Sequence, residues 1–378
     1  MLPVIALLTG TRTITDTGFR MVYPLLPVFA RGVQVEVSAI VSVLALMQLL
    51  GLVAPFIGRV SEQRGRKFTI LLGLLLYLTG MVSVLILPDF TGLAIALLLG
   101  AFGRTALGPA MQAYIGDKVP YQRRGLYLGV VELAWSGAFL FGVPAMTWLI
   151  ANYNWQAPFL ALAILCMLSF MIIWLRVEPD VPVVRHVAFL PALRAAISSP
   201  MALAGLCLGF SISAANQLVS VVFGTWIEAS FGIQLAALAV AAAVIGLSEL
   251  GGEGIVTFFA DKFGKRRLVL LGVSGNILAC FILPLTGANL NLALAGLFFF
   301  YLTFELSVVA SIPLATELSP DSRAMYLTVL MAAVTLGRAL LTPLAPTLFA
   351  SGLLANCLVA AGFNLIAIFV VWRYITVK

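Results

Sequence analysis

Long apolar runs separated by short polar connections make up nearly the whole chain. Each run has roughly 20 residues, the length at which a helix crosses about 30 Å of hydrocarbon. The pattern predicts about twelve membrane-spanning helices in two sets of six, with a polar stretch between the sets. The expected helices lie near residues 2–30, 38–58, 68–88, 91–116, 124–150 and 155–176, and then near 199–227, 233–259, 267–287, 290–316, 323–350 and 352–374. The expected fold is an all-α membrane protein whose domains are two pseudo-symmetric six-helix bundles, 1–176 and 199–378, joined by a linker at 177–198.

Composition supports a membrane protein. Hydrophobic residues make up 62% of the 378 residues and charged residues 10%, whereas a soluble domain carries about 25% charged residues. The first apolar run begins at once and holds charges at its middle, unlike a cleaved signal peptide. The chain lacks HExxH, GxSxG and P-loop motifs, so we expect neither an enzyme nor an ATP-driven pump, and no cofactor. No metal site is expected either, because the four cysteines fall in apolar runs without ligand spacing.

Basic residues gather in alternate connections between the predicted helices. One set of connections holds clusters such as Arg64, Arg66 and Lys67, whereas the other set has Arg31 as its only basic residue. By the positive-inside rule, the basic side faces the cytoplasm, together with the linker and both termini. We therefore expect a multi-pass protein of the inner (plasma) membrane. The net charge of +7 reflects this topology and predicts the lipid bilayer, not a nucleic acid, as partner.

Two loop sequences recur in the second half of the chain. The segment DKVPYQRRG at 117–125 returns as ELSPDSRAM at 317–325, an offset of 200 residues. The segment GRVSEQRGRK at 58–67 returns as TFFADKFGKR at 257–266, an offset of 199. Two parallel six-helix repeats are typical of transporters that rock about a central site.

The first of the recurring loops resembles the G-x-x-x-D-R-x-G-R-K motif of the major facilitator superfamily. Glu62 stands in its acidic position, and the second copy keeps most of the motif with Thr257 in place of the leading glycine. By this resemblance the chain is identified as a member of that superfamily over its whole length. The resemblance implies a monomeric transporter that carries a small molecule by alternating access.

The same motif predicts a latch between the two halves. Gly58 and Gly65 are expected to allow close packing and a tight turn. Glu62 could meet the positive N-terminal end of the eleventh helix, and Arg66 could pair with Asp117. The resemblance implies that this cluster holds the outward-open state, and the repeat predicts a second cluster of Asp261, Gly264, Lys265 and Glu317.

The stretch RTITDTGFR at 12–20 places charges in the middle of the first predicted helix. Arg12, Asp16 and Arg20 fall within an arc of roughly 80° on a helix, and Tyr23 falls in the same arc. Each charge would cost about 3 kcal/mol if it faced lipid at mid-depth. This cost predicts that the stripe faces the interior, and the family resemblance implies that it lines the central cavity.

Other charged residues in the predicted spans extend this set. We expect Asp16, between the two arginines of its own helix, to stay ionised and orient them, although it remains a candidate for proton binding. Glu132 and Glu305 have no basic neighbour on their own helices and are the better proton carriers. The repeat offset places Asn216 and Gln217 in an uncharged version of the stripe. The expected cavity residues are Arg12, Asp16, Arg20, Tyr23, Arg104, Trp135, Asn216, Gln217 and Arg338.

Three functions fit these features. The leading one is proton-coupled export of amphipathic or lipophilic molecules, because the residues from Arg104 to Gly108 resemble an R-x-x-x-G element of proton-coupled antiporters in this superfamily. The fifth predicted helix departs from that group, since it lacks an adjacent Gly-Pro pair. The alternative is a carrier for an anionic metabolite or lipid headgroup bound by the cavity arginines. A non-transporting sensor is less favoured because both halves keep their loop motifs.

Overall fold

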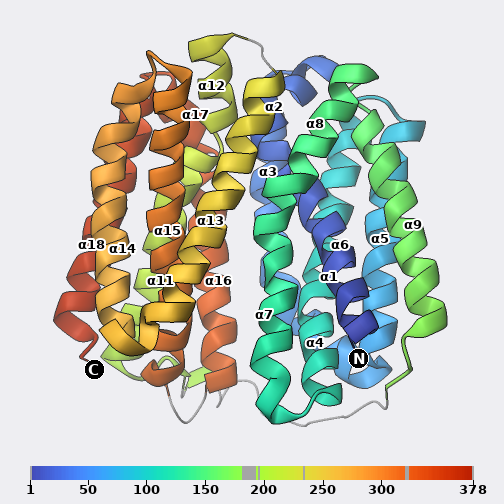
Figure 1. Ribbon diagram of the computed structural model, residues 1–378, viewed down its shortest axis with the longest axis horizontal. Coiled ribbons are helices and arrows are strands. Elements are labelled where there is room, and N and C mark those ends of the chain that lie inside the picture. Colours follow the sequence, from blue (N-terminus) through green and yellow to red (C-terminus); the bar gives the residue numbers. More distant parts are fainter. Residues whose placement is uncertain (1, 181–192, 195, 233–234, 320–322, 377–378) are drawn as a thin grey trace. The chain divides into compact units, whose positions relative to one another are not determined.

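The computed structural model describes residues 2–180, 193–194, 196–232, 235–319 and 323–376. These residues are helical almost throughout and contain no strand (Figure 1). Contacts divide the chain into two compact units. The first unit comprises Met1–Arg185 and Leu238–Gly246, and the second comprises His186–Ala237 and Leu247–Lys378.

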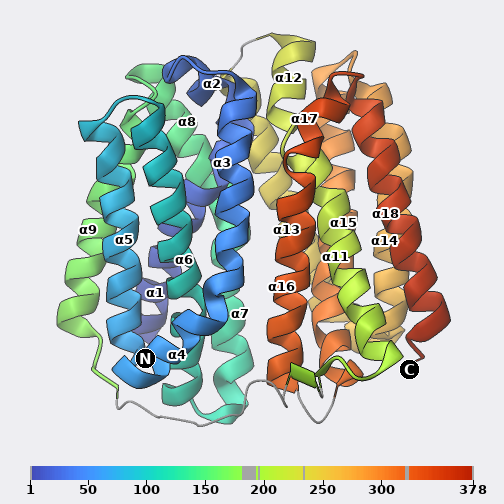
Figure 2. The same cartoon turned by 180° about the vertical axis from the view of Figure 1, so that it is seen from behind.

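The first unit holds six runs of helix, three of which change pitch or direction on the way. Its elements are α1 (Leu2–Arg20), α2 (Val22–Gly32), α3 (Val37–Leu49), the 3₁₀ turn η1 (Leu50–Val53), α4 (Ala54–Arg64), α5 (Arg66–Ile86), α6 (Phe90–Lys118), α7 (Tyr121–Gly137), the π-helix η2 (Ala138–Gly142), α8 (Val143–Asn152) and α9 (Ala157–Arg176). In Figure 2, α5 and α6 run side by side along their lengths. Their close approach depends on two facing glycines, because a Cβ on Gly73 would lie 2.7 Å from the carbonyl oxygen of Gly103.

The second unit repeats this order of elements. They are α11 (Pro200–Ser220), α12 (Phe223–Phe231), α13 (Leu235–Phe263), α14 (Lys265–Ile282), the 3₁₀ turn η3 (Leu283–Thr286), α15 (Leu290–Leu318), α16 (Arg323–Leu341), α17 (Leu344–Phe349) and α18 (Leu353–Tyr374). The segment Leu238–Gly246 of α13 is grouped with the first unit. Helices α6 and α15 are both 29 residues long and start 200 positions apart, so the loop repeat extends into the helices.

Nine helices among the described residues are long and apolar enough to cross a membrane, or ten when the bent pair Val37–Val53 and Phe56–Arg64 counts as one span. The two other predicted spans are α1 with α2, which carries the charged stripe, and α16 with α17. The expected all-helical, twelve-span fold is confirmed. Three of the spans contain a short non-helical break, at Met21, at Val221–Val222 and at Thr342–Pro343.

Prolines account for two of these breaks. Pro24 has no N–H to give to the carbonyl of Arg20, and the helix is interrupted at Met21. Pro346 stands in the same relation to Thr342, where α16 ends. The interruption at Val221–Val222 has no proline beside it.

A buried amide network holds the second unit together. Asn276 on α14 donates to the carbonyl of Phe300 at 2.8 Å and to Thr303 Oγ1 at 3.1 Å. Asn364 on α18 in turn donates to Asn276 Oδ1 at 2.8 Å. Such bonds tie three helices together without facing a charge toward lipid.

Candidate functional site

Arg12 lies at the centre of a charged network in the first unit. Its guanidinium makes a two-pronged pair with Glu132 of α7, with Nη1–Oε1 and Nη2–Oε2 distances of 2.6 and 2.7 Å. Its Nε lies 3.4 Å from Oδ2 of Asp16, one turn along α1. Arg12 is therefore shared between two carboxylates, and the pair with Glu132 has the shorter distances.

Asp16 forms the second junction of this network. It is fully buried, and its Oδ1 accepts from Nε of Arg104 on α6 at 2.5 Å. Oδ2 accepts no hydrogen bond from any described residue, and its cation at 3.4 Å is Arg12. Asp16 thus meets Arg12 of its own helix and also Arg104 of α6, a cross-helix partner that the sequence did not indicate.

Glu132 closes the outer end of the network. Its side chain is 44% exposed, and besides Arg12 it accepts from Nε2 of Gln112 on α6 at 2.7 Å. Glu132 has no basic neighbour on its own helix, as the sequence indicated. The structure supplies that neighbour from α1. The residues Gln112, Glu132, Arg12, Asp16 and Arg104 form one continuous chain of contacts, which we call the charge relay.

Arg20 is held by aromatic rings and a backbone carbonyl. Its Nη1 donates to the carbonyl of Trp135 at 2.8 Å, and its guanidinium lies 4.0 Å from the ring centre of Trp135 and 3.6 Å from that of Phe139. Phe139 belongs to the π-helix η2, a distortion that often marks functional positions. Guanidinium groups over ring faces are stabilised by the ring quadrupole.

Arg104 has a similar aromatic neighbour. Its guanidinium lies 4.4 Å from the ring centre of Phe19 and 5.2 Å from that of Trp135. The aromatic wall of the charge relay therefore includes Trp135, as expected, together with Phe19 and Phe139, which the sequence did not single out. Tyr23 packs against Phe19, with ring centres 6.2 Å apart, and its hydroxyl accepts from Nε2 of Gln48 at 2.6 Å.

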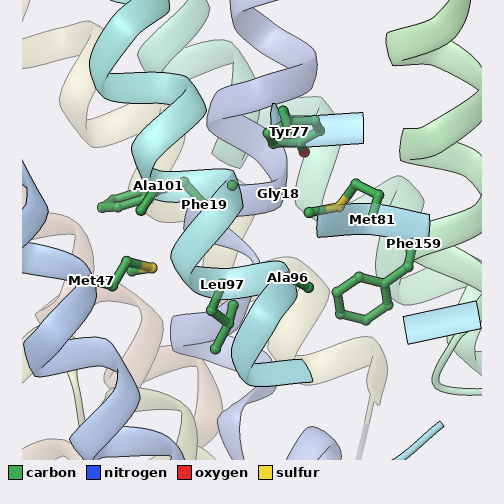
Figure 3. Close-up of a pocket in the computed structure, with 10 residues that line it drawn as sticks. Gly18, Phe19, Met47, Tyr77, Met81, Ala96, Leu97, Ala101 and Phe159 are labelled. Atoms are coloured by element: carbon green, nitrogen blue, oxygen red, sulfur yellow. The ribbon is translucent and has the colours of Figure 1, made fainter. Parts of the chain in front are cut away.

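A small apolar cavity lies on another side of α1 (Figure 3). Gly18, Phe19, Tyr77 and Phe159 are among its lining residues. About 10 Å³ is open to the centre of a water molecule, so it has room for about one water. This cavity is therefore too small to hold a transported molecule.

The expected polar stripe of the second unit lies on α11. Gln217 donates to Thr342 Oγ1 at 2.8 Å, and Asn216 accepts from Ser220 at 3.0 Å. Arg338 lies on α16, one turn before Thr342, and Glu305 is buried on α15.

The first loop motif forms a turn between α4 and α5. Gly65 there has a φ of +95°, which favours glycine, and Arg66 Nε lies 3.4 Å from Asp117 Oδ2. The close packing expected at Gly58 is wrong, because a Cβ there would meet no atom within 4 Å. Glu62 is half-buried on the last turn of α4, and its expected partner belongs to the other unit.

The second loop motif repeats this geometry between α13 and α14. Gly264 has a φ of +86°, and Lys265 forms an ion pair with Glu317 at the end of α15. The side chain of Asp261 lies outside the described residues. The structure therefore brings together the basic residue of each motif and the acid at the end of the second helix after it, α6 or α15.

An acidic segment after α9 also binds the first motif, and no pattern in the sequence indicated this contact. Asp180 accepts from the backbone N–H groups of Arg66 and Lys67 at 2.6 and 3.0 Å, and so caps α5 where Gly65 has no side chain to do so. Glu178 pairs with Lys118 at 3.0 Å. Partners that come from a distant part of the chain leave no local pattern.

Comparison with known proteins agrees with this architecture. The family model of the Major Facilitator Superfamily matches residues 8–304 and also residues 205–378. An uncharacterized MFS-type transporter, YwfA, of Bacillus subtilis is 26% identical over 91% of this chain and 86% of its own length. Multidrug resistance protein 2 of the same organism is 26% identical over 76% of this chain and 74% of its own length.

Solved structures show the same fold. The crystal structure of a D-xylose–proton symporter superposes with a TM-score of 0.78 at 18% identity, covering 99% of this chain and 97% of the symporter. Members of this superfamily are transporters of small molecules and not enzymes. The chain is a multi-pass integral membrane protein that belongs to the major facilitator superfamily.

Proposed function

We propose that this transporter exports amphipathic or lipophilic molecules in exchange for protons, with Glu132 as the proton-binding group. The observation that carries the proposal is the sharing of Arg12 between Glu132 and Asp16. Glu132 is the more exposed of the two carboxylates, so it is the one that solvent protons reach first.

Protonation of Glu132 would change the partner of Arg12. A neutral carboxyl group no longer balances the guanidinium, so its two-pronged pair weakens. Arg12 can then turn to Asp16, whose Oδ2 lies 3.4 Å away and accepts no hydrogen bond from a described residue. The relay thus has two arrangements that differ by one proton, which is what coupling requires.

Charge balance in the relay favours a cationic or neutral substrate. Arg12 and Arg104 face Asp16 and Glu132, so two positive groups are matched by two negative groups. Both arginines of the charge relay are therefore already paired with carboxylates. A lipophilic cation could instead compete with Arg12 for a carboxylate, and the similarity to a multidrug resistance protein supports this substrate class.

We further propose that bundles 1–176 and 199–378 rock against each other, with the two loop motifs as latches. The Arg66–Asp117 and Lys265–Glu317 contacts each lie within one unit, and they fix the turn from which each motif would act. In this proposal the protein is a monomer of the inner (plasma) membrane, with both termini cytoplasmic. The basic loops support that orientation.

The test uses purified protein in liposomes loaded with a pH-sensitive dye. Tetraphenylphosphonium and benzoate serve as the cationic and anionic probes, and proton movement is recorded for wild type, Glu132→Gln and the control Glu36→Gln, an exposed residue outside the relay. We expect tetraphenylphosphonium to move protons in wild type and in the control, and the signal to fall at least about tenfold in Glu132→Gln. Transport of benzoate without proton movement, unchanged in Glu132→Gln, would contradict the proposal and favour the anion carrier.

A further inference from the structure

Four polar residues form a stripe on α11, in the middle of the second unit. Ser213, Asn216, Gln217 and Ser220 fall within an arc of about 100° on the helix. All four are buried. Polar side chains buried at this depth are expected to be fully hydrogen-bonded.

Part of the stripe meets this expectation. Ser220 donates its single hydrogen to Oδ1 of Asn216 at 3.0 Å. The hydroxyl of Tyr301 on α15, 2.8 Å from Ser220, must therefore donate to Ser220. In this arrangement the NH₂ group of Asn216 is turned away from Ser220.

Two polar groups of the stripe are not hydrogen-bonded within the described part of the chain. Nδ2 of Asn216 and Oγ of Ser213 form no hydrogen bond with any described residue. Asn216 is 6% exposed and Ser213 is fully buried. Because the two residues are three positions apart on one helix, their side chains are neighbours. Together they offer a donor and a hydroxyl at one place.

The internal repeat relates Asn216 to a residue that has a charged partner. At the offset of 200, Asn216 corresponds to Asp16, which Arg104 holds in the first unit. The position that corresponds to Arg104 is Phe304 on α15, which is buried. The second unit therefore keeps the polar group and replaces its charged partner by an aromatic ring.

We propose that Asn216 and Ser213 bind an uncharged hydrogen-bond acceptor of the substrate, such as a ketone, ester or amide oxygen. This inference rests on the proposed function, because it names a substrate class for the exporter: lipophilic molecules that carry a carbonyl group. The amide donor satisfies the oxygen, and the ring of Tyr301, whose hydroxyl contacts the stripe, suits the apolar remainder. Binding sites that combine apolar walls with a few placed polar groups recognise such molecules.

The test is photolabelling of the purified full chain by benzophenone, with the labelled peptides identified by mass spectrometry. The competitors are 9-fluorenone, which has a carbonyl; fluorene, which lacks it; and fluorene-9-carboxylate, which is an anion. The variants are Asn216→Leu, Ser213→Ala and the matched control Ser211→Ala, a buried serine on the opposite side of α11. A melting curve for each variant shows that it is folded.

In wild type we expect label on α11 or α15, and protection by 9-fluorenone at about tenfold lower concentration than by fluorene. The ratio of the protecting concentrations of fluorene and 9-fluorenone should fall to about one in Asn216→Leu and fall partly in Ser213→Ala. It should be unchanged in Ser211→Ala. Equal protection by fluorenone and fluorene in wild type would overturn the proposal. So would stronger protection by the carboxylate, or the absence of label on both helices.

The same measurement in Glu132→Gln separates this inference from the proposed function. Glu132 belongs to the first unit, so the preference for 9-fluorenone should survive its replacement. Loss of the preference in Glu132→Gln would contradict a separate carbonyl site in the second unit. If the protein prefers 9-fluorenone but moves no protons, the carbonyl site is supported and proton-coupled export is contradicted.

Discussion

Replacing Arg12 by leucine is expected to abolish transport and to lower the free energy of unfolding by about 3–5 kcal/mol. The substitution removes the guanidinium that balances Glu132 and contributes to balancing Asp16. Because Asp16 is fully buried, water cannot replace the lost charge, and at least one carboxylate must take up a proton permanently. A relay locked in its protonated form has no second arrangement to adopt.

Two further variants give this prediction its controls. Arg12→Lys keeps the charge but cannot form the two-pronged pair with Glu132. We therefore expect a smaller loss of unfolding free energy than in Arg12→Leu, and transport that is uncoupled or slow. Arg176→Leu removes an exposed arginine at the end of α9 and should change neither property. Probe flux into liposomes and thermal unfolding are the measurements. Flux in Arg12→Leu above about half of the wild-type rate would contradict the role of Arg12.

The second large effect is expected at the Asp16–Arg104 pair. Arg104→Leu leaves a buried carboxylate without the donor at 2.5 Å, and we expect transport to fall about a hundredfold. Asp16→Asn removes the charge but keeps a polar group. The double variant Arg104→Leu/Asp16→Asn should therefore recover most of the stability lost in Arg104→Leu, because the uncompensated charge is gone. Coupling should stay lost, since the relay no longer has two carboxylates.

Unfolding free energies of the two single variants and the double variant form a double-mutant cycle. A coupling energy of about 2 kcal/mol or more is expected for a contact of this kind. If the losses of unfolding free energy in the two single variants simply add in the double variant, Arg104 and Asp16 contribute independently to stability. That result would contradict the contact seen between them.

The fold could be predicted from the sequence because its signals are local or periodic. An apolar run of roughly 20 residues specifies a spanning helix whatever surrounds it. The repeat of 58–67 in 257–266 also indicated which basic and acidic residues would meet, and Lys265 does meet Glu317. The breaks at Met21 and Thr342 follow from nearby prolines, but the π-helix η2 has no such marker in the sequence.

The partners within the site were harder to predict. Helical spacing shows which residues share a face of one helix, so it predicted that Arg12 and Asp16 lie together. It could not predict their partners on other helices, Glu132 and Arg104. Those contacts depend on how α1, α6 and α7 pack, which periodicity does not contain. Asp180 was missed for the same reason, because it caps a helix more than a hundred positions earlier.

The central claim is that Glu132 gains the proton that drives the cycle. Infrared difference spectroscopy of the protein in membranes, recorded on adding tetraphenylphosphonium, reports directly on protonated carboxyl groups. The account predicts that the substrate removes a carboxylic-acid band in wild type and in Glu36→Gln, and that this change is missing in Glu132→Gln. The same change in Glu132→Gln as in wild type would show that another carboxyl group carries the proton, and would contradict the account.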